Sequence, residues 1–223
     1  KDIDILSQNK LLRGADGKDN GTDSTAVGAV TVQAGKTSTT VTADSKVIVG
    51  SNAVITGTGV SSTSDTGVHG AQQVRLQAFN IMDVRDSLAF ASGSLIGIPA
   101  VSSELKATLN TLVDIGENAA IRTTSALGSD VIIHAGSYDG ASLEAGANLY
   151  GLVSAGSLSG MLDITSTNKV HVRTGVKLYS SRDLALAAGK IGYKYVTAAG
   201  ANIFGATKSE DMRDIGDANI YLA

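Results

Sequence analysis

A short unit of glycine, any residue and asparagine recurs along this chain and separates brief runs of aliphatic and polar residues. Glycine and asparagine tolerate positive φ, so the unit lets a strand turn a corner and start again. We therefore predict that each copy is a structural corner of the fold. The predicted corner residues are Gly50, Asn52, Gly116, Asn118, Gly146, Asn148, Gly200 and Asn202.

The runs between these units indicate strands. Residues 30–34, 131–135 and 170–173 alternate aliphatic with other side chains and are rich in Val, Ile and Thr. Period-two alternation bounded by turn-forming residues is typical of half-buried strands, and helical spacing is scarce. Successive glycines of the unit lie about thirty residues apart, or about half of that, which predicts a coil of two or three short strands.

A sheet of antiparallel hairpins is the alternative to stacked coils. It would favour two-residue turns such as Asp16-Gly17 and Asp139-Gly140. The repeated Gly-x-Asn corner instead suits a solenoid in which each coil lies in parallel on the next. We predict an all-β fold, a right-handed parallel β-helix (β-solenoid) with loop insertions.

The whole chain, residues 1–223, is expected to be one β-solenoid segment, and we expect it to be part of a longer chain. Polar or irregular composition predicts loops or insertions at residues 13–24, 61–70 and 83–110. Within the third of these, residues 102–109 are compatible with a short helix that begins at Ser102.

Composition excludes several classes of protein. The chain has 26 Gly, a single Pro, no Cys and no Trp, so small side chains must fill much of its interior. Its 18 basic and 21 acidic residues give a net charge of -3 with no basic patch, which predicts no nucleic-acid partner. No apolar run is long enough to predict a membrane-spanning helix. The lack of cysteine fits a secreted bacterial protein.

Three segments resemble the repeats of large bacterial surface adhesins. Residues 90–98, 113–121 and 129–135 form a small apolar Gly-rich block, an Ile-Gly-x-Asn-Ala strand and an Asp-Val-x-Ile-x-Ala strand. In this order they are similar to filamentous-haemagglutinin-like and leukotoxin-A-like adhesins, and the likeness covers residues 74–223. The resemblance implies a right-handed parallel β-helix, export to the bacterial cell surface, and repeats without catalytic residues or a cofactor.

Candidate site residues are few and scattered. Asp16, Asp19 and Asp23 are weak candidates for a Ca²⁺ site, because their spacing misses the EF-hand pattern. The three histidines, His69, His134 and His171, lie far apart in the sequence, so we expect them to hold no metal.

An enzyme must also be weighed, because many parallel β-helices degrade polysaccharides. Asp83, Arg85 and Asp86 are the nearest approach to an acid/base group. We interpret them as soluble loop residues. A threonine run at residues 37–42 is interpreted as a strand, because an ice- or glycan-binding ladder needs the same pair of threonines in coil after coil.

These observations favour a structural or adhesive segment of a secreted, surface-exposed bacterial protein that has no catalytic role. A polysaccharide-degrading lyase or hydrolase on the same fold is the alternative. The expected partners are neighbouring coils of a longer chain, or copies of this chain stacked end to end as a fibre. Glycans or proteins of a host or a neighbouring cell are further candidates.

Overall fold

The computed structural model describes residues 2–13, 22–58, 72–124, 128–150, 153–154, 157–202 and 207–222. The described residues form an all-β fold, in which strands are joined by short turns and no helix is present. The strands are β1 Ile3–Arg13, β2 Thr22–Val49, β3 Val54–Gly57, β4 Gln72–Ile115, β5 Ala120–Thr123, β6 Ser129–Tyr150, β7 Val153–Ser154, β8 Ser157–Val172, β9 Lys177–Tyr179, β10 Leu184–Asn202 and β11 Thr207–Leu222.

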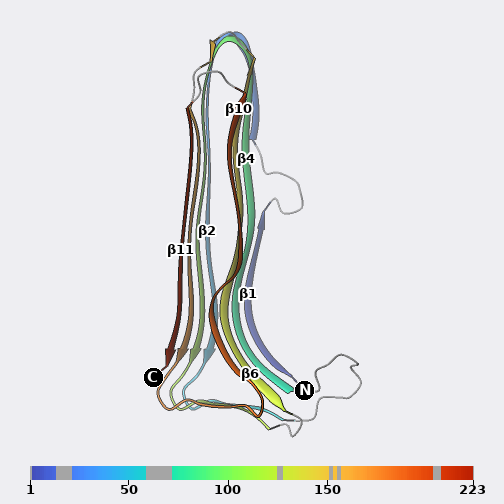
Figure 1. Cartoon of the computed structure of the whole chain (residues 1–223), viewed down its shortest axis with the longest axis vertical. Coiled ribbons are helices and arrows are strands. Elements are labelled where there is room, and N and C mark those ends of the chain that lie inside the picture. The colour runs from blue at the N-terminus through green and yellow to red at the C-terminus, as the bar shows by residue number, and fades with distance from the viewer. Residues whose placement is uncertain are drawn as a thin grey trace, which may run out of the picture.

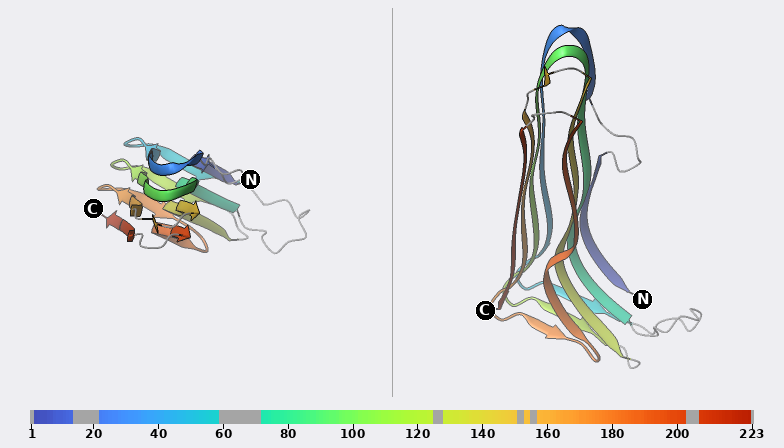
Figure 2. Two further views of the ribbon diagram at one scale, coloured as in Figure 1. Left: turned by 90° about the horizontal axis from the view of Figure 1, so that it is seen from above. Right: turned by 45° about the horizontal axis from the view of Figure 1, so that its top comes forward.

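All pairs among the described strands are parallel, and each joins one pass of the chain to the next. The long strand β4 rises along one leg of the molecule, bends over the top and returns along the other leg (Figure 1). The short strands β3, β5 and β9 form a second sheet across the base (Figure 2). This arrangement is consistent with a β-solenoid and excludes the antiparallel hairpin sheet.

One coil is longer than the sequence predicts. The register partners Thr37 and Ser103 are 66 residues apart, and Thr111 and Asn168 are 57 residues apart. The prediction of about thirty residues per coil is therefore wrong. The reason is that half of the predicted corners lie inside extended strands, so a coil runs the full length of both legs before it closes.

Corners are present at the base of the second leg. Asn52 and Asn118 have φ of 60° and 56°, and Gly175 has φ of 74°. These three residues occupy equivalent places, because Val49, Ile115 and Val172 are register partners three residues before them. The backbone ladder continues through the corner. The backbone N–H of Asn52 donates to the carbonyl of Glu117 at 2.8 Å, and the backbone N–H of Asn118 donates to the carbonyl of Thr174 at 3.0 Å.

The other predicted corners are strand residues. Gly146 and Asn148 lie in β6, and Gly200 and Asn202 lie in β10. The two glycines pair with each other in register, as do the two asparagines. The structure thus places these four residues in extended strand, where pairing with a neighbouring coil holds the backbone, and not in a corner like that of Asn52.

The predicted insertion at residues 83–110 is also wrong, because the whole segment lies within β4. The expected short helix at residues 102–109 is strand, paired with residues 36–43 on one side and 159–166 on the other. Within the predicted loop 13–24, Arg13 belongs to β1 and residues 22–24 belong to β2. Residues 14–21 and the predicted loop 61–70 lie outside the described residues.

Alternation along the strands directs every second side chain into the space between the two legs. The inward residues form two hydrophobic clusters. The cluster near the base includes Leu76, Val113, Ile115, Ile121, Val131 and Val170, and the cluster above it includes Met82, Leu105, Leu109, Leu143, Leu162 and Ile164.

A polar layer separates the two clusters. The buried side chain of Asn80 donates from Nδ2 to the carbonyls of Ala43 at 3.1 Å and Asn110 at 2.8 Å. Its Oδ1 accepts from Asn9 Nδ2 at 3.1 Å and Ser45 Oγ at 3.0 Å. The amide thus uses both donors and both acceptor positions, which is what burial of such a group requires.

The layer continues into the next coils. Thr111 Oγ1 donates to Asn168 Oδ1 at 2.7 Å, and Asn168 Nδ2 donates to Ser137 Oγ at 3.4 Å. These bonds join strands of both legs, since Ser137 lies in β6 and Asn168 in β8. The layer therefore fixes both the register of the coils and the spacing of the legs.

Two corner glycines give a matched test of how closely the coils stack. A Cβ on Gly116 would lie 2.5 Å from the amide nitrogen of Ser51, whereas a Cβ on Gly50 would meet nothing within 4 Å. Gly116→Ala should therefore lower the free energy of unfolding by about 3 kcal/mol, as overpacking does. Gly50→Ala should change it by less than about 0.5 kcal/mol. Urea unfolding of both variants measures the difference, and equal effects would contradict the stacking of these corners.

Candidate functional site

Of the three candidate Ca²⁺ ligands, only Asp23 lies among the described residues. Asp16 and Asp19 lie outside them. Asp23 lies in β2, where its backbone pairs with Ala89 of β4. In the part of the chain that the structure describes, no group of three or more His, Cys, Asp or Glu side chains is arranged to hold a metal ion.

The two described histidines lie on different legs and pack against neighbouring coils. The ring of His134 in β6 meets Phe79 edge to face, with ring centroids 4.9 Å apart. Burial lowers the pKa of His134. His171 in β8 meets Tyr221 edge to face at 5.9 Å, and its Nδ1 lies 3.6 Å from Asp114. Both rings thus bridge adjacent coils, and His69 lies outside the described residues.

The residues of the enzyme hypothesis, Asp83, Arg85 and Asp86, lie on two different faces of β4. Asp83 is half-buried on the outer face, 3.9 Å from Arg85. Asp86 points inward and is buried, where it accepts a hydrogen bond from the Thr39 hydroxyl and forms an ion pair with Arg13 at 3.1 Å. The two carboxylates therefore cannot act on one substrate atom.

Ion pairs link coil to coil instead. Asp130 accepts two hydrogen bonds from Arg182, at 2.8 Å and 2.5 Å, and these bonds hold the pKa of Asp130 below its usual range. Asp114 accepts two from Arg173, at 2.9 Å and 2.8 Å, with the same effect on the pKa of Asp114. In each pair the carboxylate and the guanidinium belong to successive coils.

A third cluster lies higher on the second leg. The carboxylate of Glu104 lies 2.7 Å from the ammonium of Lys106 and 2.9 Å from that of Lys36, which belongs to the preceding coil. Hydrogen bonding from Lys106 lowers the pKa of Glu104, and the same bond raises the pKa of Lys106. Glu104 thus pairs with one cation of its own strand and with one of the preceding coil.

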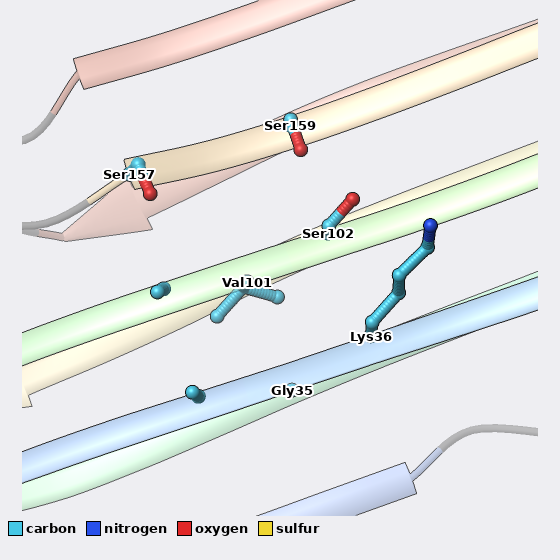
Figure 3. A pocket seen from close by; sticks show the side chains of 8 residues that line it. Gly35, Lys36, Val101, Ser102, Ser157 and Ser159 are labelled. Carbon is cyan, nitrogen blue, oxygen red and sulfur yellow. The ribbon is translucent and has the colours of Figure 1, made fainter.

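A shallow hollow of about 370 Å³ lies beside this cluster, on the outer face of the second leg. It crosses three coils, because Ala34, Ala100 and Ser157 are register partners (Figure 3). The other lining residues are Gly35, Lys36, Val101, Ser102 and Ser159. The lining offers methyl groups, hydroxyls and one ammonium that Glu104 neutralises. It contains no histidine or carboxylate to activate a serine hydroxyl.

A column of threonines crosses the outer face of the same leg. Thr42, Thr108 and Thr165 are register partners in three successive coils. The column two residues further on is mixed, with Asp44, Asn110 and Thr167. The sequence did not predict this column, because its members lie more than fifty residues apart and no local pattern connects them. One column of threonines without a second does not form the repeated pair that a threonine ladder needs.

Comparisons with known proteins give no relative for this chain: no family model, no curated protein and no solved structure matches it. Among the described residues, no helix is long and apolar enough to cross a membrane. The resemblance to surface adhesins therefore remains a resemblance of motifs.

The Asp130 ion pair predicts how stability depends on pH. Because the pKa of Asp130 is lowered in the folded chain, its contribution is complete above the unfolded-state value of about 3.9. It is lost as the pH falls through the lower folded-state value. Asp130→Asn and Arg182→Gln should each reduce the loss of unfolding free energy between about pH 5 and about pH 2. Urea unfolding at a series of pH values measures this loss. An unchanged slope in both variants would show that the pair contributes nothing to the acid dependence.

Proposed function

We propose that this chain is a non-catalytic segment of right-handed parallel β-helix that builds length and presents an outer face in a large secreted bacterial surface protein. The observation that carries the proposal is the pairing of successive coils in parallel along both legs and at the base. A rod of this kind gains stability with each added coil and needs no disulfides.

The use made of polar side chains supports a structural role. Asp86, Asp114 and Asp130 are each held by an arginine of a neighbouring coil. Glu104 is held by two lysines. A catalytic carboxylate needs open access to a substrate and a second group acting on the same bond, and these four carboxylates instead neutralise cations across coil boundaries.

An adhesive role rests on the motif resemblance and on the outer face. The resemblance supports a position at the bacterial cell surface, where glycans or proteins of a host or neighbouring cell would be the partners. The outer face of the second leg carries the column of Thr42, Thr108 and Thr165 and, two residues further on, the column of Asp44, Asn110 and Thr167. Such a face suits weak contacts repeated along a rod, which add up through multivalency.

Removal of one coil tests the structural proposal. Deletion of residues 131–183 joins Asp130 to Leu184, and Leu184 is the register partner of Val131. β10 and β11 then take the places of β6 and β8 beside β4. The shortened chain should keep a cooperative urea transition and a strand-type circular dichroism spectrum, with a lower free energy of unfolding because one coil interface is lost.

A deletion that is one residue longer, residues 131–184, is the matched control. A slip of one residue turns every inward side chain of β10 outward, so this variant should lose cooperative unfolding. Equal folding of both deletions, or unfolding of the in-register deletion, would overturn the stacked-coil basis of the proposed function.

A further inference from the structure

The long strands bend from one leg to the other through segments that contain no charged residue. No Asp, Glu, Lys, Arg or His occurs in residues 24–35, 87–103, 145–162 and 195–207. Pairing of the described residues lays these segments on one another in successive coils. In Figure 2 the blue band of β2 and the green band of β4 arch over the top next to each other. We call this uncharged region the cap.

Aliphatic side chains on the outer face of the cap are open to solvent. Ile96 pairs with Val30 of the preceding coil and with Val153 of the following coil, and it is nevertheless 39% exposed. Ile98 lies two residues further along β4 and is 42% exposed, and its register partner Val32 is 71% exposed. Because Ile96 has a paired neighbour on each side, its exposure comes from the outward direction of its side chain and not from an open edge of the stack.

Charged side chains return directly below the cap on both legs. On the second leg, Lys36 and Glu104 form an ion pair at 2.9 Å. On the first leg, Asp86 pairs with Arg13 at 3.1 Å, and Arg13 donates a hydrogen bond to Thr39 of the second leg at 2.8 Å. Among the described strands, the uncharged cap therefore ends at a layer of charges that joins the two legs.

The backbone of the cap is hydrogen-bonded from coil to coil. The register of β2 on β4 continues through the bend without a shift, from Thr22 beside Leu88 to Val49 beside Ile115. A hydrocarbon phase offers no hydrogen bonds, so a segment that enters it must satisfy its N–H and C=O groups internally. The parallel ladder meets this requirement for the paired strands of the cap.

Side-chain size in the cap differs from coil to coil, and the feature that recurs is the lack of charge. One column at the bend contains Val27 in β2, Gly93 in β4 and Tyr150 in β6. A groove in a protein partner needs side chains of matching size and shape. A fluid hydrocarbon phase accepts side chains of any size and mainly excludes charges. The cap therefore fits a lipid better than a protein groove.

We propose that the cap binds the surface of a phospholipid bilayer with zwitterionic headgroups, the membrane of the cell that the rod contacts. The proposal rests on the stacked-coil function above and names lipid as a partner of the rod. The exposed aliphatic side chains enter the boundary of the acyl chains, as the apolar face of an interfacial helix does. The charges below the cap then lie among the headgroups, whose phosphate and ammonium groups complement both signs. The aromatic residues Phe90, Tyr150, Tyr195 and Phe204 belong to the uncharged segments, and Tyr is enriched at membrane interfaces.

Flotation with phosphatidylcholine vesicles tests the cap through a matched pair of substitutions. Ile98→Lys places a charge on the outer face of the cap, where the side chain is already 42% exposed. Ile48→Lys makes the same change at a 68% exposed isoleucine near the base of β2, outside the cap. The unchanged chain and Ile48→Lys should float with the vesicles, and Ile98→Lys should bind at least about tenfold more weakly. Both variants should keep the urea midpoint of the unchanged chain, because both sites are exposed.

A single tryptophan reports which part of the chain enters the bilayer. The chain has no tryptophan of its own, so an introduced one gives the whole tryptophan signal. The emission of Ile96→Trp should shift to shorter wavelength on addition of vesicles and should be quenched by lipids brominated on their acyl chains. The emission of Ile48→Trp should change in neither way.

Four results would overturn this inference. They are no flotation with phosphatidylcholine vesicles, flotation with anionic vesicles alone, equal weakening by Ile98→Lys and Ile48→Lys, or equal quenching of the two tryptophan variants. If the chain binds no vesicles while its in-register coil deletion still folds, only the lipid contact is refuted. Failure of that deletion to fold would refute the stacked-coil function itself.

Discussion

The parallel backbone ladder between successive coils is the constraint on which the rest of this structure depends. Each long strand lies on the next with its residues in register along both legs, as for β4 on β6 and β8. Parallel pairing in register stacks each residue on its counterpart, so the inward columns are aliphatic in the two clusters and polar in the layer between them. The two hydrophobic clusters, the polar layer between them and the ion pairs outside are all consequences of this stacking.

The polar groups inside and outside the coils specify which register the ladder takes. The side-chain amide of Asn80 is satisfied only when Ser45 and Asn110 lie beside it, and a slip of two residues would keep Asn80 inward but remove these partners. Hydrophobic columns alone tolerate a slip of two residues, because the inward faces repeat with that period. The buried side-chain amides and the ion pair between Asp130 and Arg182 exclude such a slip, because each has its partners in only one register.

The sequence analysis predicted the class of fold and two of its corners. Asn52 and Asn118 have the positive φ that their position two residues after a glycine implied, because the signal there is local to three residues. Gly146 and Asn148 carry the same signal within a strand, where partners more than fifty residues away hold the backbone extended. The same distance concealed the strand character of residues 83–110, the column of Thr42, Thr108 and Thr165, and the partners of Asn80. The register between long coils depends on the pairing of strands that are far apart in the sequence, so a local sequence pattern does not predict it.

Spin labels on neighbouring coils test the parallel register most directly. Thr108 and Thr165 are register partners on the outer face, about 4.8 Å apart in the direction of the backbone hydrogen bonds. Nitroxides attached through cysteines at these two positions should show strong dipolar broadening in a monomeric sample. Labels at Thr108 and Lys169, which are out of register along β8, should show much less. Equal spectra from the two pairs, or stronger broadening from the second, would contradict the account.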